Sequence, residues 1–250
     1  PDALIRILHA KKISTDLPDN GHYSLKAYSH YLSHGGLPGI FAIRDAGIRR
    51  QRFETQLNTL LERDLKLIIQ STLSYRQLRA LAARLAARSG QPLELSSLSR
   101  EARISTPTLR KLIAAFEAMY LIRIIPTEGS QRKPVIFFED VGEANYLADI
   151  GRDEIQAFTA FLFANLRTQF VYRPEAEVQV FQYRTRDGAL VPLCFRSKGH
   201  VLGIIPSLEE TPAPSVLGSA KSFLASYPHS NVLVVHPGRT DRTLSGRIRI

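Results

Sequence analysis

The stretch Leu93–Asp140 decides the fold that we expect, and it reads LELSSLSREARISTPTLRKLIAAFEAMYLIRIIPTEGSQRKPVIFFED. A short helix should begin at Ser96 or Ser97, where a side-chain hydroxyl can accept a hydrogen bond from an unpaired backbone N–H. After a three-residue turn, Thr106 should cap a second helix. Pro107 then takes the first helical position, where the missing N–H costs no hydrogen bond. The start of this stretch therefore predicts a helix-turn-helix.

The second helix and the strands after it extend this prediction. Apolar side chains recur at spacings of three and four, the pattern of a helix with one face on a core: Leu109, Leu112, Ile113, Phe116, Met119 and Tyr120. The opposite face keeps Thr108, Arg110, Lys111 and Ala115. Two β-rich runs follow, Ile122–Ile125 and Val135–Phe138, joined by a basic connection. Together these elements predict a winged helix-turn-helix whose ribbon has a basic tip.

Composition points to an anionic partner. The chain has 250 residues, enough for one large domain or two to three small ones, with an ordinary hydrophobic fraction of 44%. Its net charge of +10 is unusual, and the positive charge is mostly arginine, which suits phosphate contacts. Nucleic acid is therefore the first partner to expect, and an acidic protein surface the second.

The compartment is predicted from what the sequence lacks. Cys194 is the single cysteine, so an intrachain disulfide and a cysteine zinc cluster are excluded, and a reducing cytoplasm fits. No apolar run reaches the roughly 18–20 residues that span a bilayer, so we expect no membrane partner. The sequence opens at Pro1 without an initiator Met or a signal-peptide pattern. We expect residue 1 to be an internal position of a longer protein.

The regions before and after the central stretch differ in their predicted secondary structure. Before the central stretch we expect helices at Ser24–His34, Ala46–Gln70 and Ser74–Arg88. The long middle helix carries an apolar stripe of Ile48, Phe53, Leu57, Leu60, Leu61, Leu65 and Ile68. After the central stretch we expect helices Glu143–Ile150 and Asp153–Phe170, strands Glu177–Tyr183, Ala189–Phe195 and Val201–Ile205, helix Ser215–Tyr227 and strand Asn231–His236. This tail predicts an α/β unit of helix, antiparallel strands, crossover helix and strand.

Four motifs in order carry a family resemblance: YLSHGGLP at 31–38, LLERDL at 60–65, PVIFFEDVG at 134–142 and YRTRDG at 183–188. With the winged helix, they resemble the C-terminal region of bacterial and archaeal AAA-type ATP-binding proteins, over roughly residues 24–250. That region of unknown function joins a helical segment, a winged helix and a sheet related to PD-(D/E)XK nucleases. The resemblance implies an α+β multidomain chain. Its parts are a lid-like helical segment (1–72), a winged helix-turn-helix (73–140) and an α/β restriction-endonuclease-like domain (141–250).

The chain departs from this family in its catalytic parts. No G-x-x-x-x-G-K-[ST] motif occurs, so this chain should hold no cofactor, and ATP and Mg²⁺ belong to the family's N-terminal ATPase domain. A nuclease needs carboxylates and a lysine around Mg²⁺. The segments compared with those positions are TAFLFANL at 159–166, LVPL at 190–193 and IIPS at 204–207, and they carry none. We therefore expect no catalytic residue and an inactive nuclease-like domain.

Histidines give no metal site in our interpretation. His30 and His34 are one helical turn apart, as zinc ligands can be, but no acidic third ligand lies near in sequence. A histidine favoured by the helix dipole at the C-terminus is the simpler interpretation of His34. Cys194 alternates inward on a strand, and we expect a small core residue there.

The predicted DNA contacts come from the winged helix. Thr108, Arg110 and Lys111 would meet the major groove and backbone, beside Ser105 and Thr106 at the helix N-terminus. Arg132 and Lys133 on the ribbon tip would reach phosphates. The alternative is that this winged helix only packs and that these charges are solvated. Arg49, Arg50 and Arg52 would extend the basic surface or dock on an acidic ATPase face.

These inferences predict a non-catalytic, regulatory C-terminal region of an AAA-type ATPase that binds double-stranded DNA through its winged helix. Its other partner would be its own N-terminal ATPase domain. The alternative function is a protein-interaction module that couples an ATPase to a partner without nucleic acid. A third function, an active metal-dependent nuclease, would require Mg²⁺-dependent cleavage.

Overall fold

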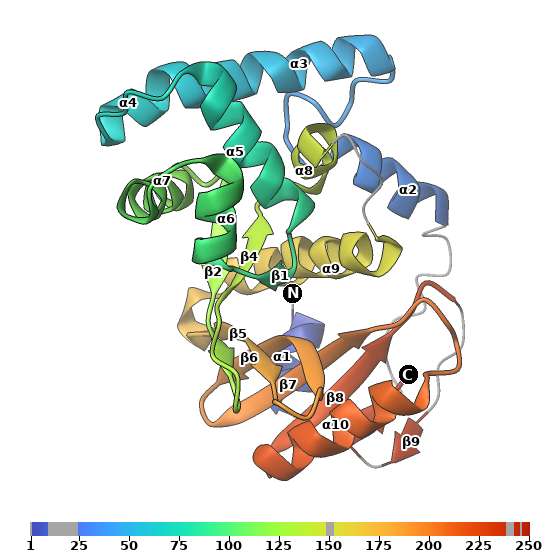
Figure 1. Cartoon of the computed structure of the whole chain (residues 1–250). Coiled ribbons are helices and arrows are strands. Elements are labelled where there is room, and N and C mark those ends of the chain that lie inside the picture. The colour runs from blue at the N-terminus through green and yellow to red at the C-terminus, as the bar shows by residue number, and fades with distance from the viewer. Residues whose placement is uncertain (1, 10–24, 149–152, 239–242, 246) are drawn as a thin grey trace. The chain divides into compact units, whose positions relative to one another are not determined.

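The structure is a computed structural model that describes residues 2–9, 25–148, 153–238, 243–245 and 247–250. It is a mixed α/β protein with two sheets (Figure 1). The chain forms two compact units, each assembled from separated stretches. The helical unit comprises residues 24–124 and 135–160, and the sheet unit comprises the described parts of 1–23, 125–134 and 161–250. The three-part division expected from the sequence instead runs consecutively along the chain.

The helical unit begins with helices and closes with a small sheet. Its elements are α2 (Leu25–His34), α3 (Ala46–Asn58), the π-helix η1 (Thr59–Asp64), α4 (Leu65–Ile68), α5 (Tyr75–Ala87), β1 (Gln91–Pro92), α6 (Leu95–Ala102), α7 (Thr106–Ala118), β2 (Ile122–Ile125), β4 (Val135–Phe138) and α8 (Val141–Ala148). The sheet has the order β1-β4-β2. Both predicted strands of the ribbon, 122–125 and 135–138, are confirmed.

One core joins most of these elements. Leucines of α3, η1 and α4 pack with leucines of α5 and with Leu109, Leu112 and Phe116 of α7, which are all fully buried. Phe138 of β4 and Ala144 of α8 complete the core. The apolar residues of α7, spaced three and four apart, therefore form one buried face, as expected for an amphipathic helix.

The sheet unit is built on a seven-stranded sheet of order β3-β5-β6-β7-β8-β10-β9. Its strands are β3 (Thr127–Glu128), β5 (Gln179–Arg184), β6 (Leu190–Ser197), β7 (His200–Pro206), β8 (Ser230–Val235), β9 (Thr243–Ser245) and β10 (Ile248–Arg249). Its helices are α1 (Asp2–His9), the 3₁₀ turn η2 (Pro174–Ala176) and α10 (Pro214–Ser226). The helix α9 (Glu154–Val171) begins in the helical unit and ends in the sheet unit.

Strand directions confirm the predicted α/β unit. β5, β6 and β7 form an antiparallel meander, and β7 pairs in parallel with β8 through the crossover helix α10. Phe223 of α10 packs in the same core as Val191, Cys194 and Val232. Cys194 is completely buried there, so its predicted role as a small core residue is confirmed.

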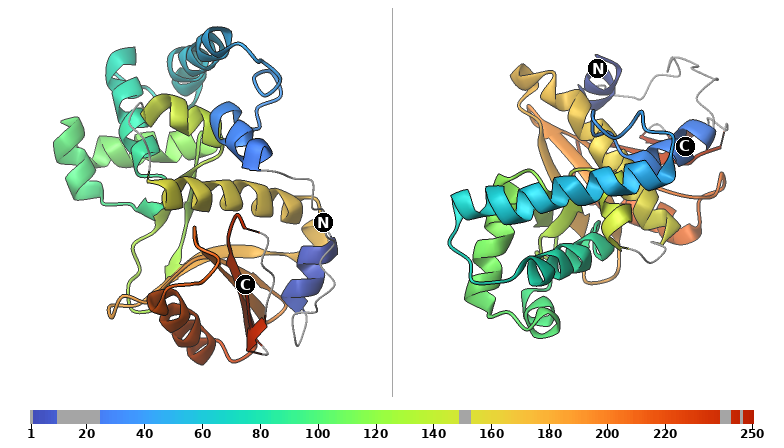
Figure 2. Two further views of the ribbon diagram at one scale, coloured as in Figure 1. Left: turned by 90° about the vertical axis from the view of Figure 1, so that its right-hand side faces the viewer. Right: turned by 90° about the horizontal axis from the view of Figure 1, so that it is seen from above.

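The long predicted helix over 46–70 is wrong in one respect, because η1 interrupts it. Figure 2 shows α3, η1 and α4 following one another along one continuous run. A π-turn holds more residues per turn than an α-helix, so it rotates the residues after it around the axis. Ile68, predicted to face inward, is 46% exposed, and Ile48 near the start of α3 is 53% exposed.

Three predictions at α7 are also wrong. The capping residue is Ser105, since its side chain accepts the Thr108 N–H, and Thr106 is the first helical residue. Ala115, expected on the outer face, is buried. Tyr120, expected on the apolar stripe, is 72% exposed because α7 ends at Ala118 and Tyr120 adopts a left-handed φ of 57°.

Candidate nucleic-acid interface

The turn between α6 and α7 is tight and internally bonded. Arg103 takes a left-handed φ of 55°, which ends α6 and reverses the chain. The Ile104 N–H then donates to the Ser99 carbonyl, and the Ser99 hydroxyl donates back to the Ile104 carbonyl at 2.6 Å. Leu98 and Leu109, one from each helix, are buried in the shared core. The two helices are thus fixed relative to each other.

The hydroxyl groups at the start of α7 form hydrogen bonds within the helix-turn-helix. The Ser105 Oγ accepts the Thr108 N–H and lies 2.8 Å from the Thr108 Oγ1. The Thr106 Oγ1 donates to the Ser99 Oγ at 3.3 Å, and Thr106 is half-buried. Of these three candidates, Ser105 and Thr108 are exposed, whereas Thr106 serves the packing of the turn.

Arg110 and Lys111 lie on the exposed side of α7. Within the described part of the chain neither has a carboxylate partner. The acidic side chains of this region are occupied elsewhere: Glu101 pairs with Arg88 and accepts the Ser97 hydroxyl, and Glu117 Oε1 accepts the Ile124 N–H at 3.0 Å. The positive charge of α7 is therefore not cancelled locally.

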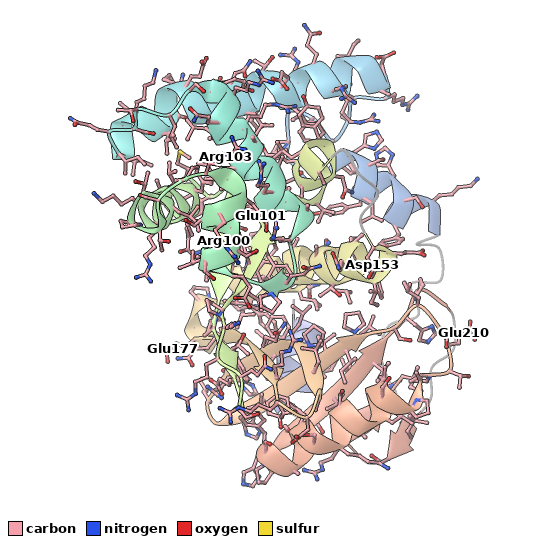
Figure 3. All side chains as sticks on the ribbon, viewed as in Figure 1. Arg100, Glu101, Arg103, Asp153, Glu177 and Glu210 are labelled. Carbon is pink, nitrogen blue, oxygen red and sulfur yellow. The ribbon has the colours of Figure 1, made fainter. Side chains whose placement is uncertain are left out.

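Two further cations belong to this surface and were missed by sequence reasoning. Figure 3 shows Arg100 at the end of α6 and Arg103 in the turn. Both are exposed, and the Arg100 Nε donates to the Ser96 carbonyl, a neutral acceptor. The available signal was their position in the sequence, just before α7.

The predicted ribbon tip is anchored in the sheet unit. β3 pairs in parallel with β5, placing Thr127 opposite Gln182 and Glu128 opposite Tyr183. The Gln131 N–H donates to the Arg184 carbonyl, and the Arg186 N–H donates to the Ser130 Oγ at 2.7 Å. The connection is thus a strand and a bonded turn of the larger sheet.

Arg132 and Lys133 keep exposed side chains on this anchored connection. The Lys133 carbonyl accepts the Thr127 hydroxyl at 2.6 Å. The two residues belong to the sheet unit, whereas Ser105, Thr106, Thr108, Arg110 and Lys111 belong to the helical unit. The exposed helix candidates Ser105, Thr108, Arg110 and Lys111 therefore belong to a different unit from the connection.

Glu128 holds β3 in place. Its carboxylate receives both Arg196 Nη atoms, at 2.8 and 2.7 Å, and the Tyr227 hydroxyl at 2.6 Å. The hydrogen bond from Arg196 is the main reason that the pKa of the Glu128 carboxyl is lowered. This bidentate pair is the geometry in which arginine binds a carboxylate best.

The first and third resemblance motifs meet inside the helical unit. Asp140 Oδ2 accepts the Gly36 N–H at 2.6 Å, and its Oδ1 accepts the Glu143 N–H at 2.7 Å. Burial raises the pKa of the Asp140 carboxyl, and these backbone N–H groups oppose the rise. Gly35, at φ +70°, faces this carboxylate with no room for a side chain. The motifs thus form a structural clasp between α2 and α8.

The strand residues compared with the acidic nuclease positions are apolar. Leu190 and Pro192 on β6 are half-buried, and Ile205 on β7 is buried. Their side chains offer no oxygen ligand for a metal ion. Among the described residues there is also no group of three His, Cys, Asp or Glu side chains placed to hold a metal ion.

His30 and His34 stack on each other, with ring centroids 3.7 Å apart. The His34 Nε2 lies 2.7 Å from the Arg49 Nη1, and its Nδ1 lies 2.9 Å from the His30 carbonyl. A ring that donates from Nδ1 and accepts at Nε2 is neutral. Burial lowers the pKa of His34, in keeping with that state. Both nitrogens are engaged, so His34 orients Arg49.

The pair α6 and α7 is thus a helix-turn-helix whose exposed basic residues have no carboxylate partner among the described residues. The same unit contains the contact between Gly35-Gly36 and Asp140-Val141-Gly142. A family model described as "Domain of unknown function (DUF8612)" matches residues 25–154, just over half of the 250 residues. The chain belongs to this family. The match nearly coincides with the helical unit, together with the connection 125–134. Neither the curated proteins nor the solved structures contain a significant match. No helix in the described parts of the chain is long and apolar enough to cross a membrane.

Proposed function

We propose that this chain is a non-catalytic DNA-binding region of an AAA-type ATPase and that α7 contacts duplex DNA. The observation that carries the proposal is the charge at α7. Arg110 and Lys111 are exposed without a carboxylate partner in the described structure, while Glu101 and Glu117 are satisfied internally. Uncompensated arginine and lysine on one helix face are what phosphate contacts require.

The order of elements supports a winged helix. α5, β1, α6, α7, β2 and β4 follow in that order, and β4 lies between β1 and β2 in the sheet. In a helix-turn-helix the second helix is the one that enters the major groove. That role falls to α7, whose exposed residues Thr108, Arg110 and Lys111 would reach base edges or phosphates. Arg100 at the end of α6 and Arg103 in the turn would add contacts to the DNA backbone.

The sheet unit has a structural role in this proposal. By the sequence resemblance it would be the nuclease-like part, and Leu190, Pro192 and Ile205 stand where carboxylates are expected on its strands. A hard divalent cation needs oxygen ligands that these side chains do not supply. We expect supercoiled plasmid to stay uncleaved in the presence of Mg²⁺, measured over hours by gel electrophoresis.

A salt titration of duplex binding tests the proposal. Arg110→Ala/Lys111→Ala should weaken binding about tenfold or more at low salt and reduce the slope of log affinity against log salt by about two. The matched control is Lys26→Ala/Lys66→Ala, which removes the same charge from exposed sites on α2 and α4. Equal affinity and slope in the wild type and the α7 variant would contradict DNA binding by α7.

The anchored connection is tested separately. If the connection 125–134 also contacts the duplex, adding Arg132→Ala to the α7 variant should lower the affinity for DNA further. Fluorescence anisotropy with the same labelled duplex measures this step.

A further inference from the structure

The helical unit has a groove that is lined by no residue of α7. It is bounded by α2, α3 and α8, is open on one side and has a volume of about 640 Å³. That volume falls within the roughly 300–1,000 Å³ of ordinary ligand sites. We propose that this groove binds an acidic peptide segment of a partner protein, with Arg49 and Arg50 receiving its carboxylates.

The Arg49 side chain is fixed in position by hydrogen bonds to uncharged acceptors. Its Nη1 donates to the His34 Nε2 at 2.7 Å and to the Ile43 carbonyl at 3.0 Å, both uncharged acceptors. These bonds fix the side chain but leave its positive charge unpaired within the described residues. An arginine that is already oriented loses less conformational freedom when it binds a carboxylate.

The carboxylates around the groove are committed to other partners. Glu54 accepts hydrogen bonds from the Tyr75 and Tyr146 hydroxyls and pairs with Arg79. The hydrogen bond from Tyr146 is the main reason that the pKa of Glu54 is lowered. Asp45 caps α3 by accepting the Ile48 N–H at 2.8 Å. Glu54 and Asp45 are therefore both engaged away from Arg49.

The floor of the groove favours a peptide over a nucleic acid. Leu32 and the buried Phe53 contribute apolar surface, and Tyr146 stacks on Phe53 with ring centroids 5.5 Å apart. The Arg50 guanidinium lies 5.5 Å from the Tyr146 ring centroid. Tyrosine, arginine and apolar side chains in one concave site are the composition of protein–protein hot spots. The expected ligand is therefore an extended segment with Asp or Glu beside an aromatic or aliphatic residue.

The experiment uses the full chain as bait for a random peptide library displayed on phage. Enriched peptides should carry an acidic residue next to an apolar one. For a selected peptide, labelled with fluorescein, Arg49→Ala/Arg50→Ala should weaken binding at least about tenfold. Ser29→Trp should do the same by filling the groove from α2 without changing its charge. Circular dichroism establishes that each variant is folded.

Two controls separate this site from the DNA surface. Arg52→Ala, an exposed arginine on the same helix that does not line the groove, should bind the peptide like the wild type, as should Arg110→Ala/Lys111→Ala. Enrichment of peptides without acidic residues would overturn the proposal. So would unchanged binding in Ser29→Trp, or a labelled single-stranded oligonucleotide that binds the groove and displaces the peptide.

Discussion

Glu143 of α8 is a carboxyl group buried without a partner for one of its oxygens. Its side chain is 3% exposed, and Oε1 makes no hydrogen bond. Burial, with a smaller contribution from the nearby Asp140 carboxylate, raises the pKa of Glu143 to about 8. The residue is therefore protonated in the folded protein at neutral pH.

The folded protein should lose stability as pH rises because of this one residue. Between pH 4.5 and about 8 the unfolded chain releases the Glu143 proton and the folded chain keeps it. The free energy of unfolding therefore falls with pH in this window, by at most about 1.4 kcal/mol per pH unit. Urea unfolding of wild type and Glu143→Gln across this range measures the effect.

The substitution Glu143→Gln should flatten the pH dependence, since an amide does not titrate there. Glu62→Gln is the control, because Glu62 is exposed on η1. An identical decline in the wild type and Glu143→Gln would refute the assignment.

Gly142 is the second residue with a sharp consequence. A Cβ at this position would lie 2.6 Å from the His34 carbonyl carbon and 2.8 Å from the Gly35 Cα. Both are backbone atoms, which cannot rotate away. Gly142→Ala should therefore lower the free energy of unfolding by about 3 kcal/mol. Gly39→Ala, where nothing lies within 4 Å, should change it by less than about 0.5 kcal/mol in the same denaturation experiment.

At the scale of elements, the short helix α4 buries one side and exposes the other. Leu65 is 1% exposed and Leu67 is 82% exposed. Leu65→Ala should cost about 2–5 kcal/mol by leaving a cavity, and Leu67→Ala should cost less than about 0.5 kcal/mol. Thermal and urea unfolding of this matched pair measures both losses. Equal losses in the two variants would contradict the one-sided burial of α4.

Most elements of the helical unit could be predicted because their signals are local. The apolar spacing of α7, the turn before it and the two β-rich runs all lie within one short stretch, Leu93–Asp140. η1 could not be predicted, since the leucines at 57, 61 and 65 fit an uninterrupted α-helix equally well. Tyr120 was misplaced because a spacing pattern continues past a helix end that backbone geometry sets.

The site was predictable only in part, for a similar reason. Arg110 and Lys111 follow from their side of one helix, which sequence spacing gives directly. Glu101 pairs with Arg88, and Glu117 accepts the Ile124 N–H, and both of these partners belong to other elements. Whether a charge is compensated is thus a tertiary property.

At the scale of the whole molecule, the two units are interleaved in sequence. The connection 125–134 belongs to the sheet unit because Thr127 pairs with Gln182, far along the chain. Such long-range pairing leaves no local trace, so the anchored tip was missed.

This interleaving predicts which fragments fold. A fragment of residues 24–160 keeps every strand and helix of the helical unit and should unfold cooperatively, as followed by circular dichroism. A fragment of residues 1–124 lacks β4, whose four residues are all buried, and lacks α8. It should show no cooperative transition. A cooperative transition in the shorter fragment would contradict the division into units.

The anchoring of β3 has a consequence for the isolated family domain. In a fragment of residues 24–160, Thr127 and Glu128 keep their backbone N–H and C=O groups but lose β5. An unpaired strand edge is a template for another chain. The separated domain should therefore pair edge to edge with its own copies, so that its sedimentation depends on concentration. In the full chain, pairing of β3 with β5 would prevent this self-association.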